Sequence, residues 1–292
     1  MSTDVEREAR PGIGTRLQSG AQSAVKSGGD KLVSAGTFAT FLLRTVAAIP
    51  GTLRNYRAET FRILLDISWG TGAILVGGGT IGVMVLLALS AGTSLGIEGF
   101  NGLETIGLSP LTGFVSAVVN TRELAPLVAA LALAAQVGCR YTAQLGSMRT
   151  SEEIDALSVM AVPSIPYLVT TRVIATMMAI LPLFMIGLAG SYLASQMAVT
   201  MMFGQPPGTY EHYFGTFIAV SDVIFAVIKI LIFAFAVTII HCWYGFMATG
   251  GAEGVGEATG KAIRASIVTV VVLNMALTLV FWGNDPGVRI SG

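Results

Sequence analysis

Charged residues are scarce in this chain. They make up 12% of its 292 residues, about half the fraction found in an average soluble domain, while hydrophobic residues make up 53%. This composition excludes an intrinsically disordered chain and most soluble folds. The 17 basic residues balance the 17 acidic ones, so no overall positive charge draws the chain to nucleic acid. The composition predicts an all-α polytopic membrane protein.

Cysteine and histidine are also scarce, with two of each: Cys139, Cys242, His212 and His241. No C-x-x-C or H-x-x-x-H spacing joins them, so the sequence has no signature of a zinc site or of Cys–His catalysis. Both cysteines lie in or beside apolar stretches, where cysteine behaves as a small buried hydrophobic residue. We predict no disulfide and no metal site.

Long uncharged runs are what the sequence does contain. A helix needs about 20 apolar residues to cross the hydrocarbon core, and this length predicts five spans, over residues 69–91, 108–140, 166–202, 214–247 and 262–283. The second is long enough to be one tilted helix, and Pro182 should kink the third. The apolar stretch 35–49 is shorter and contains Arg44, which predicts an amphipathic helix in the membrane interface.

Basic residues are distributed very unevenly among the connections. Nine precede Trp69, two (Arg140 and Arg149) follow the second predicted span, and two (Lys261 and Arg264) precede the fifth; the opposite side carries only Arg289. By the positive-inside rule the N-terminus is cytoplasmic and the C-terminus is outside, in the periplasm. Residues 1–30 lack the apolar core of a secretory signal. We expect a flexible cytoplasmic tail over 1–30, an interfacial region over 31–66 and a short outer tail over 285–292.

The short cytoplasmic segment between the second and third spans carries a helix pattern. Thr150 and Glu153 have the spacing of a capping box, and Ile154, Leu157 and Ala161 form an apolar stripe beside acidic residues. We expect a helix over about 150–161, stopped before Pro163. Its residues Arg149, Thr150, Glu152, Glu153, Ile154, Asp155 and Leu157 could form a surface for a soluble partner. The alternative is a solvated helix that only joins two spans.

Three motifs carry a resemblance to a known family. They are R-E-L-A-P at 122–126, Q-L-G-S-M-R at 144–149 and E-E-I-D-A-L at 152–157. In this order and spacing they resemble the MlaE/YrbE family of ABC-type lipid-transporter permeases, and most closely the YrbE permeases of actinobacterial Mce import systems. The resemblance extends more loosely from about residue 37 to 282, and includes the glycine-rich stretch 250–256, which we expect to be a connection between the fourth and fifth spans. Residues 67–284 would be the permease domain.

The resemblance implies a multi-pass subunit of the inner (plasma) membrane that moves lipids or fatty acids and is not itself an enzyme. The likeness to Mce systems implies that the direction is import. Expected partners are a second permease, identical or more typically a paralogue, a cytoplasmic ATPase dimer that binds ATP and Mg²⁺, and Mce-type proteins outside. Segment 149–160 would be the coupling helix on the ATPase. The chain has no Walker A loop, because Val255 and Ala262 replace the first Gly and the hydroxyl residue around Gly260-Lys261. We therefore expect no cofactor on this chain.

Three positions depart from the family pattern. Gln144 stands where the family usually has Glu, the segment 134–138 reads A-A-Q-V-G where an Arg is usual, and Ala161 replaces the Gly of Met-Gly. The loss of one acid and one base would suit one half of a heterodimer.

Arg122 and Glu123 lie far from either end of their apolar tract. Ionisable groups inside a bilayer are costly and usually face a polar pathway, so we expect Arg122 to attract an anionic headgroup or carboxylate and Glu123 to position it, beside the lipid cavity that the resemblance implies. The alternative is an ion pair that fixes helix packing. Asp222 and Lys229, seven residues apart on one helix, cannot pair tightly with each other. We expect each to meet a charge on another helix, with Arg172 as a candidate partner for Asp222, and to have a structural role.

Small residues at four-residue spacing indicate close helix packing. They are Gly78 and Gly82 in the first predicted span, and Gly187, Ser191 and Ser195 in the third. Packing within the chain and contact with a second permease both remain open. Two other functions stay in view: a non-transporting scaffold for envelope proteins, and an intramembrane acyltransferase or protease using Ser191, Ser195 or His241. No G-x-S-x-G elbow surrounds those serines.

Overall fold

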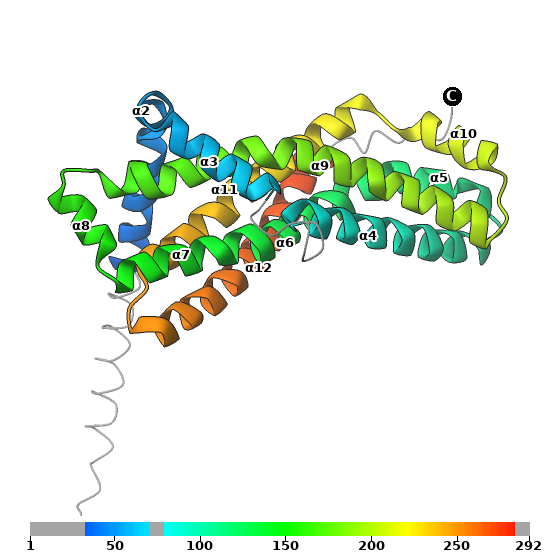
Figure 1. The fold of residues 1–292 in the computed structure, drawn as a ribbon. Helices are drawn as coiled ribbons and strands as arrows, with labels where there is room; N and C mark the ends of the chain where they lie inside the picture. The colour runs from blue at the N-terminus through cyan, green and yellow to red at the C-terminus, as the bar shows by residue number, and fades with distance from the viewer. Residues whose placement is uncertain (1–32, 70–78, 284–292) are drawn as a thin grey trace, which may run out of the picture. The chain divides into compact units, whose positions relative to one another are not determined.

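The structure is a computed structural model and describes residues 33–69 and 79–283. Every regular element in this part of the chain is helical (Figure 1), as the composition predicts. The chain divides into two compact units, residues 1–46 and 47–292. The described part of the first unit belongs to one helix, Val33–Ala47, which covers most of the predicted interfacial helix. By length and composition it counts as a span only if it is joined to α2 (Ile49–Asn55).

Within the described residues, five helical segments are long and apolar enough to cross a membrane, as the sequence predicts. They are Thr80–Glu104, Ser109–Thr150, Ile165–Met202, Val220–Phe246 and Gly251–Trp282. The first lies within α4 (Gly79–Glu104), the fourth is α11 (Val220–Phe246) and the fifth is α12 (Gly251–Trp282). The second combines η1 (Ser109–Leu111), α5 (Thr112–Val115), η2 (Ser116–Leu124), α6 (Ala125–Leu133), η3 (Ala134–Gly138) and α7 (Cys139–Thr150). The third combines η4 (Ile165–Thr170), α9 (Thr171–Met197) and η5 (Ala198–Met202).

The first and fifth spans differ from the predicted boundaries. The prediction of 69–91 begins where α3 (Arg57–Trp69) ends, and part of it lies outside the described residues; α4 runs past Glu98 to Glu104, because a single charge does not stop a helix. The glycine-rich stretch is not a connection. After Gly250 (φ 91°) turns the chain, α12 begins at Gly251, and the exposed pair Glu257–Lys261 at 2.8 Å supports its first turns.

The predicted fourth span, 214–247, is divided into two helices. α10 (Pro207–Phe217) ends before two residues with extended backbone, Ile218 (φ −73°, ψ 118°) and Ala219 (φ −106°, ψ 139°), and α11 follows. Hydrophobicity continues across both residues, so the pattern alone gave no sign of this break.

α4 and α9 cross at very short range. A Cβ atom built on Gly92 would lie 2.2 Å from the backbone oxygen of Ser191, and one on Gly96 would lie 2.8 Å from that of Ser195. Only glycine allows such an approach. Gly187 has more room, since its Cβ would meet that of Ala88 at 3.5 Å. The predicted ridge of Gly187, Ser191 and Ser195 therefore packs within this chain, against α4. Gly82 lies on α4, and Gly78 lies outside the described residues.

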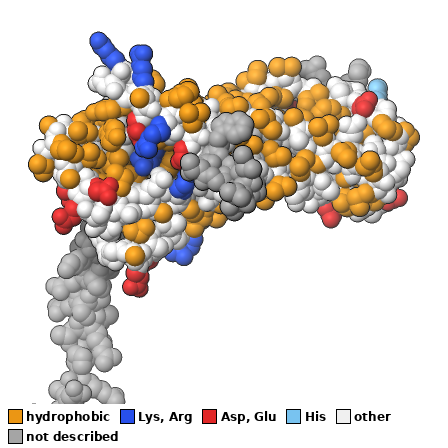
Figure 2. Space-filling model, viewed as in Figure 1, with side chains coloured by type: hydrophobic (Ala, Val, Ile, Leu, Met, Phe, Trp, Pro, Cys, Tyr) orange, Lys and Arg blue, Asp and Glu red, His pale blue; other side chains and the backbone are white. Residues whose placement is uncertain are grey.

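On the face shown in Figure 2, basic side chains gather toward one end of the bundle, whereas acidic side chains lie at both ends. The far end also shows a histidine, and the end with the Lys and Arg side chains carries α8 (Glu153–Val159). The position of the basic side chains agrees with the sorting of basic residues in the sequence. The cytoplasmic position of that end stays a prediction.

Candidate functional site: a charged cluster within the spans

Four ionisable side chains meet inside the apolar spans. Arg122 and Glu123 come from η2, and Asp222 and Lys229 come from α11. The exposed fraction of the side chain is 0% for Lys229, 4% for Asp222, 11% for Arg122 and 32% for Glu123. Ionisable groups inside apolar spans need a partner to keep their charge, and each of these four has one.

Arg122 pairs with Asp222. Nε and Nη2 of Arg122 donate to the same carboxylate oxygen, Oδ2, at 3.0 and 2.8 Å. The other oxygen, Oδ1, accepts a hydrogen bond from the indole Nε1 of Trp282 at 2.9 Å. The Trp282 ring also faces the guanidinium, with its centroid 5.1 Å from Cζ. Three N–H groups from two segments thus converge on one carboxylate.

Lys229 pairs with Glu123 and with the backbone of η2. Its Nζ lies 3.1 Å from Glu123 Oε1 and donates to the carbonyl oxygen of Arg122 at 2.7 Å. Residue 126, four positions after Arg122, is proline and has no N–H to offer that carbonyl. η2 is also π-helical, a geometry that is rare and often found at functional sites. Lys229 therefore stabilises an irregular turn of the helix as well as an ion pair.

α12 completes the arrangement. Asn274 Nδ2 donates to Glu123 Oε2 at 2.6 Å, and the Thr278 hydroxyl donates to Glu123 Oε1 at 2.6 Å. Lys229 Nζ also lies 2.9 Å from the Thr278 hydroxyl. We call these seven side chains the charged cluster: Arg122, Glu123, Asp222, Lys229, Asn274, Thr278 and Trp282. Its two positive and two negative charges cancel, and it joins η2, α11 and α12.

Sequence reasoning found four members of the charged cluster and missed Asn274, Thr278 and Trp282. A signal was available, because Asn274 and Thr278 are polar residues four apart in an otherwise apolar stretch and so share one helix face. The expectation that Asp222 and Lys229 each meet a charge on another helix is confirmed. The candidate pair of Asp222 with Arg172 is wrong, since Asp222 is bound to Arg122.

Arg172 lies in a different environment. Its Nη1 donates to the carbonyl of Leu168 at 2.5 Å, its Nη2 donates to Gln144 Oε1 at 3.4 Å, and Cζ lies 5.5 Å from the ring centroid of Tyr141. Gln144 is the position where the resemblance predicts glutamate. Here a neutral amide accepts the hydrogen bond from the arginine.

The predicted coupling segment forms a helix, but not with the predicted cap. α7 continues to Thr150, whose hydroxyl donates to the Ser147 carbonyl at 3.0 Å, and α8 begins at Glu153 after Glu152 adopts a left-handed conformation (φ 61°). The capping box of Thr150 and Glu153 is therefore wrong. Ser151 contacts the Glu153 carboxylate instead, at 2.9 Å. Thr150 cannot act as the cap because it is the last residue of the preceding helix.

α8 has one buried face and one exposed face. Ile154 is buried, Leu157 is half-buried, and Glu152, Glu153 and Asp155 are exposed. Arg149 Nη1 pairs with Asp155 at 2.7 Å across the α7–α8 turn. At the far end of α8, Val159 is 89% exposed and Met160 is 64% exposed. Acidic and large apolar side chains together give α8 a surface that a soluble protein could contact.

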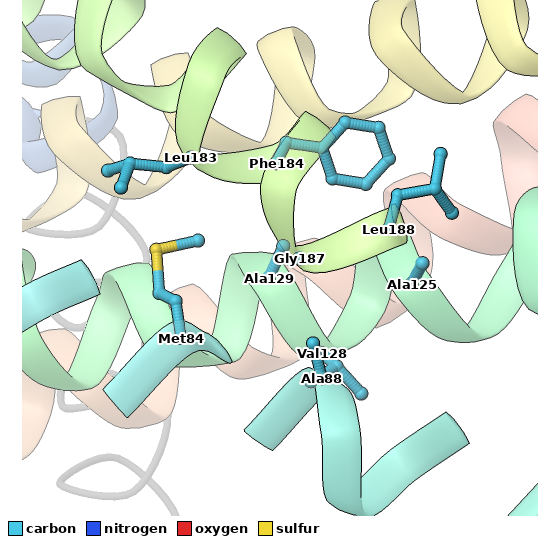
Figure 3. Close-up of a pocket in the computed structure, with 9 residues that line it drawn as sticks. All are labelled: Met84, Ala88, Ala125, Val128, Ala129, Leu183, Phe184, Gly187 and Leu188. Atoms are coloured by element: carbon cyan, nitrogen blue, oxygen red, sulfur yellow. The ribbon is translucent and has the colours of Figure 1, made fainter. Parts of the chain in front are cut away.

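A small pocket lies between α4, α6 and α9 (Figure 3). It has room for about one water molecule, far less than a pocket for a small ligand. Its lining residues are Met84, Ala88, Ala125, Val128, Ala129, Leu183, Phe184, Gly187 and Leu188. Since it lacks polar groups and is small, we interpret it as a gap in helix packing.

Polar side chains also hold η2 against α9. Asn120 Nδ2 donates to Ser191 Oγ at 2.9 Å, and the hydroxyls of Thr121 and Tyr192 lie 2.5 Å apart. On α10, burial raises the pKa of Tyr210 above its ordinary value, while the neighbouring Ser116 and Ser195 hydroxyls oppose the rise. Through its hydrogen bond with Asn120, Ser191 takes part in the structural contact between η2 and α9.

His241 lies apart from the serines considered for catalysis. Its Nδ1 lies 2.8 Å from the Thr142 hydroxyl and its Nε2 lies 3.3 Å from the Ser266 hydroxyl. Ser191 is instead bound to Asn120 and to the Leu188 carbonyl. Across residues 33–69 and 79–283 no group of three or more His, Cys, Asp or Glu side chains could hold a metal ion.

Comparison with known proteins decides the family. The profile of the family described as Permease MlaE matches residues 69–280, which include α4 to α11 and nearly all of α12. The chain belongs to the MlaE permease family. Both η2, with Arg122 and Glu123, and α8 lie inside the matched region. As an ABC transporter permease of this family, it is an integral membrane protein.

Several curated relatives resemble this MlaE-family permease. A probable ABC transporter permease protein of Synechocystis sp. is 34% identical over 183 residues, which cover 61% of this chain and 68% of the relative. One from Rickettsia bellii is 28% identical over 209 residues, covering 72% and 81%. The chloroplastic protein TRIGALACTOSYLDIACYLGLYCEROL 1 of Arabidopsis thaliana is 31% identical over 207 residues, covering 70% of this chain and 58% of that longer protein.

Proposed function

We propose that this MlaE-family chain is the permease subunit of an ATP-driven transporter that moves lipids or fatty acids between the cell envelope and the inner membrane or cytoplasm. The main support is the charged cluster, which places four ionisable side chains within apolar spans. Such groups are costly in a bilayer and typically mark a polar pathway. The Arabidopsis relative, whose name is that of a galactolipid, agrees with a lipid as substrate.

Arg122 and Glu123 are the proposed substrate-path residues. Glu123 is the most exposed of the four ionisable groups, at 32%, and so lies at the rim of the charged cluster. Arg122 lies beside it with 11% of its side chain exposed. An anionic headgroup that reaches this rim would meet the guanidinium of Arg122 after passing the carboxylate of Glu123, which Lys229 neutralises.

α8 is the proposed coupling helix on a separate ATPase. Its supporting features are the exposed acids, the exposed Val159 and Met160, and the Arg149–Asp155 pair that fixes its angle to α7. ATP and Mg²⁺ would bind to the ATPase dimer, because this chain carries no Walker A loop. Ile154 and Leu157 would transmit movement of the ATPase to α7 and the spans.

The remaining partners follow from the resemblance. A second permease, identical or a paralogue, would complete the lipid cavity, and Mce-type proteins would contact the outer end, where α10 lies. The end that carries α8 would face the cytoplasm, with the C-terminus outside, and transport would run inward across the inner membrane. The substituted positions Gln144 and Ala161 favour a paralogous partner.

Reconstitution tests the proposal. The chain is incorporated into proteoliposomes with its second permease and ATPase, and transfer of a fluorescent fatty acid or phospholipid is followed with ATP and with a non-hydrolysable analogue. We expect transfer only with hydrolysable ATP. A complex that hydrolyses no ATP in response to lipid and moves none would favour a scaffold.

A further inference from the structure

We infer that Arg122 and Trp282 form an oxyanion site, and that Asp222 occupies it as an internal ligand which the acidic headgroup of a lipid displaces. This inference rests on the proposed function, because it specifies the substrate class of the same site. It adds that Trp282 shares the binding of the headgroup oxyanion, a carboxylate or a phosphate, with Arg122, and that Asp222 is its competitor.

The donors around Asp222 are those of an anion-binding site. Two N–H groups of Arg122, at 3.0 and 2.8 Å, and the indole N–H of Trp282, at 2.9 Å, all donate to one carboxylate. Charge-assisted bonds from a planar guanidinium suit carboxylate and phosphate oxygens equally. The carboxylate bound there, that of Asp222, belongs to the chain itself.

Contacts that do not involve Asp222 hold the backbone of Arg122 in place. Lys229 donates to the carbonyl of Arg122 and pairs with Glu123, so η2 stays attached to α11 two turns away from Asp222. Arg122 can therefore exchange its counterion while its backbone keeps its position.

Asp222 lies near a break in the helical backbone, although its side chain is only 4% exposed. It lies in the first turn of α11, directly after the extended residues Ile218 and Ala219 that separate α11 from α10. The neighbouring Val220 is 78% exposed. A carboxylate in the first turn of a helix is also stabilised by the helix dipole, which lowers the cost of losing Arg122 as a partner.

Charge balance gives the site its selectivity. When Asp222 leaves, the buried guanidinium needs another negative charge nearby. A ligand with a net negative headgroup supplies it, whereas a zwitterionic lipid brings its own cation into the same space. Fatty acids and acidic phospholipids share the required oxyanion, and direct binding measurements can separate them.

The test compares lipid binding by variants of the full chain in detergent, using radiolabelled palmitate, phosphatidylglycerol and phosphatidylcholine. Asp222→Asn keeps the size of the side chain but removes the competing charge, so we expect about tenfold tighter binding of the anionic lipid, a typical size for coupled sites. Arg122→Gln should abolish this binding, alone or combined with Asp222→Asn. Asp66→Asn, which removes a partner of Arg140 at 3.1 Å elsewhere, is the matched control and should bind like wild type.

The three lipids show whether the site binds a fatty-acid carboxylate or a phospholipid phosphate. Tighter palmitate binding alone identifies a carboxylate site, and tighter phosphatidylglycerol binding alone identifies a phosphate site. Equal affinities of Asp222→Asn and wild type for both, or a gain only for phosphatidylcholine, would overturn the inference. ATP-driven transport by the wild-type complex is measured separately. If that complex transports lipid but Asp222→Asn does not change lipid binding, only the role of Asp222 as a competitor is refuted.

A second measurement avoids any change at Asp222. In the Trp69→Phe, Trp243→Phe background Trp282 is the remaining tryptophan, and brominated palmitate should quench its fluorescence because the acid binds beside the ring. Quenching should disappear with Arg122→Gln. Quenching that is equal with and without Arg122, or no quenching at all, contradicts an oxyanion site at Trp282.

Discussion

The ammonium of Lys229 donates a hydrogen bond to the backbone carbonyl of Arg122 at 2.7 Å, across 107 positions of the chain. The same ammonium pairs with Glu123, so one buried side chain fixes both the backbone and the charge of η2. Loss of Lys229 should therefore destabilise the protein more than loss of an exposed ion pair does.

Replacing Lys229 with Met should destabilise the protein by about 3–5 kcal/mol, the usual cost of leaving the partner of a buried ion pair without its counterion. Chemical unfolding in detergent measures the change in free energy. The double variant Lys229→Met, Glu123→Gln should recover part of the loss, because it also removes the uncompensated carboxylate. Lys261→Met, which breaks an exposed pair, should cost less than about 1 kcal/mol; equal losses for both lysines would contradict the assigned role.

Replacing Gly92 with Ala should separate α4 from α9, because the new Cβ would lie 2.2 Å from the backbone oxygen of Ser191. The backbone of Ser191 cannot move aside as a flexible side chain can. We therefore expect overpacking to lower the free energy of unfolding by about 1–3 kcal/mol. Gly187→Ala is the control, since its Cβ has ordinary contact at 3.5 Å. Thermal unfolding compares the two. A Gly92→Ala protein as stable as Gly187→Ala would show that the helices do not cross at this distance.

Ala161 provides a stabilising prediction. Its φ of 58° is left-handed, and its N–H and that of Val162 donate to the carbonyls of Ser158 and Leu157 at 3.1 and 2.9 Å. This is a Schellman motif, in which glycine is the preferred residue. Ala161→Gly should stabilise the end of α8 by about 1 kcal/mol, seen as slower amide hydrogen exchange there.

Ala156→Gly, inside the same helix, is the control for Ala161→Gly. It should destabilise α8 by about 1 kcal/mol and speed exchange. If both glycines speed exchange, the left-handed conformation of Ala161 is not the native one.

Val159→Asp should release the ATPase. Val159 is 89% exposed, so the substitution leaves the fold unchanged while placing a charge in the proposed interface; Leu157→Asp should also release it, but from a half-buried site. Ile106→Asp, at an exposed apolar residue (66%) between the first and second spans, should leave ATPase binding intact. Co-purification measures this, and equal ATPase recovery with Val159→Asp and wild type would place the coupling surface elsewhere.

Hydrophobic run length predicted the number of spans, because bilayer thickness imposes a minimum length on each. It could not predict the break at Ile218 and Ala219, where hydrophobicity continues but the backbone becomes extended. Run length also places the start of α12 too late, because glycine-rich sequence is typical of a connection. In the structure Gly251 and Gly254 lie in the first turns of the helix.

The site was predictable only in part. Ionisable residues stand out in an apolar sequence, so Arg122, Glu123, Asp222 and Lys229 were found, but their pairing depends on which helices are neighbours. Gly92 and Gly96 were missed for the same reason, since a close crossing needs two helices to be known. The capping box at Thr150 failed because α7 continues through that residue.

Transport by Arg122→Gln tests most directly whether the charged cluster binds the substrate. Wild-type and variant chains are reconstituted with the second permease and the ATPase, and ATP-dependent transfer of palmitate is measured, with Asp66→Asn as the control. We expect Arg122→Gln to abolish transfer while ATPase binding persists. The double variant Arg122→Gln, Asp222→Asn, which also removes the carboxylate left without its partner, should likewise transfer no palmitate, and Asp66→Asn should transport normally. Transfer by Arg122→Gln at the wild-type rate would show that the charged cluster only packs the helices.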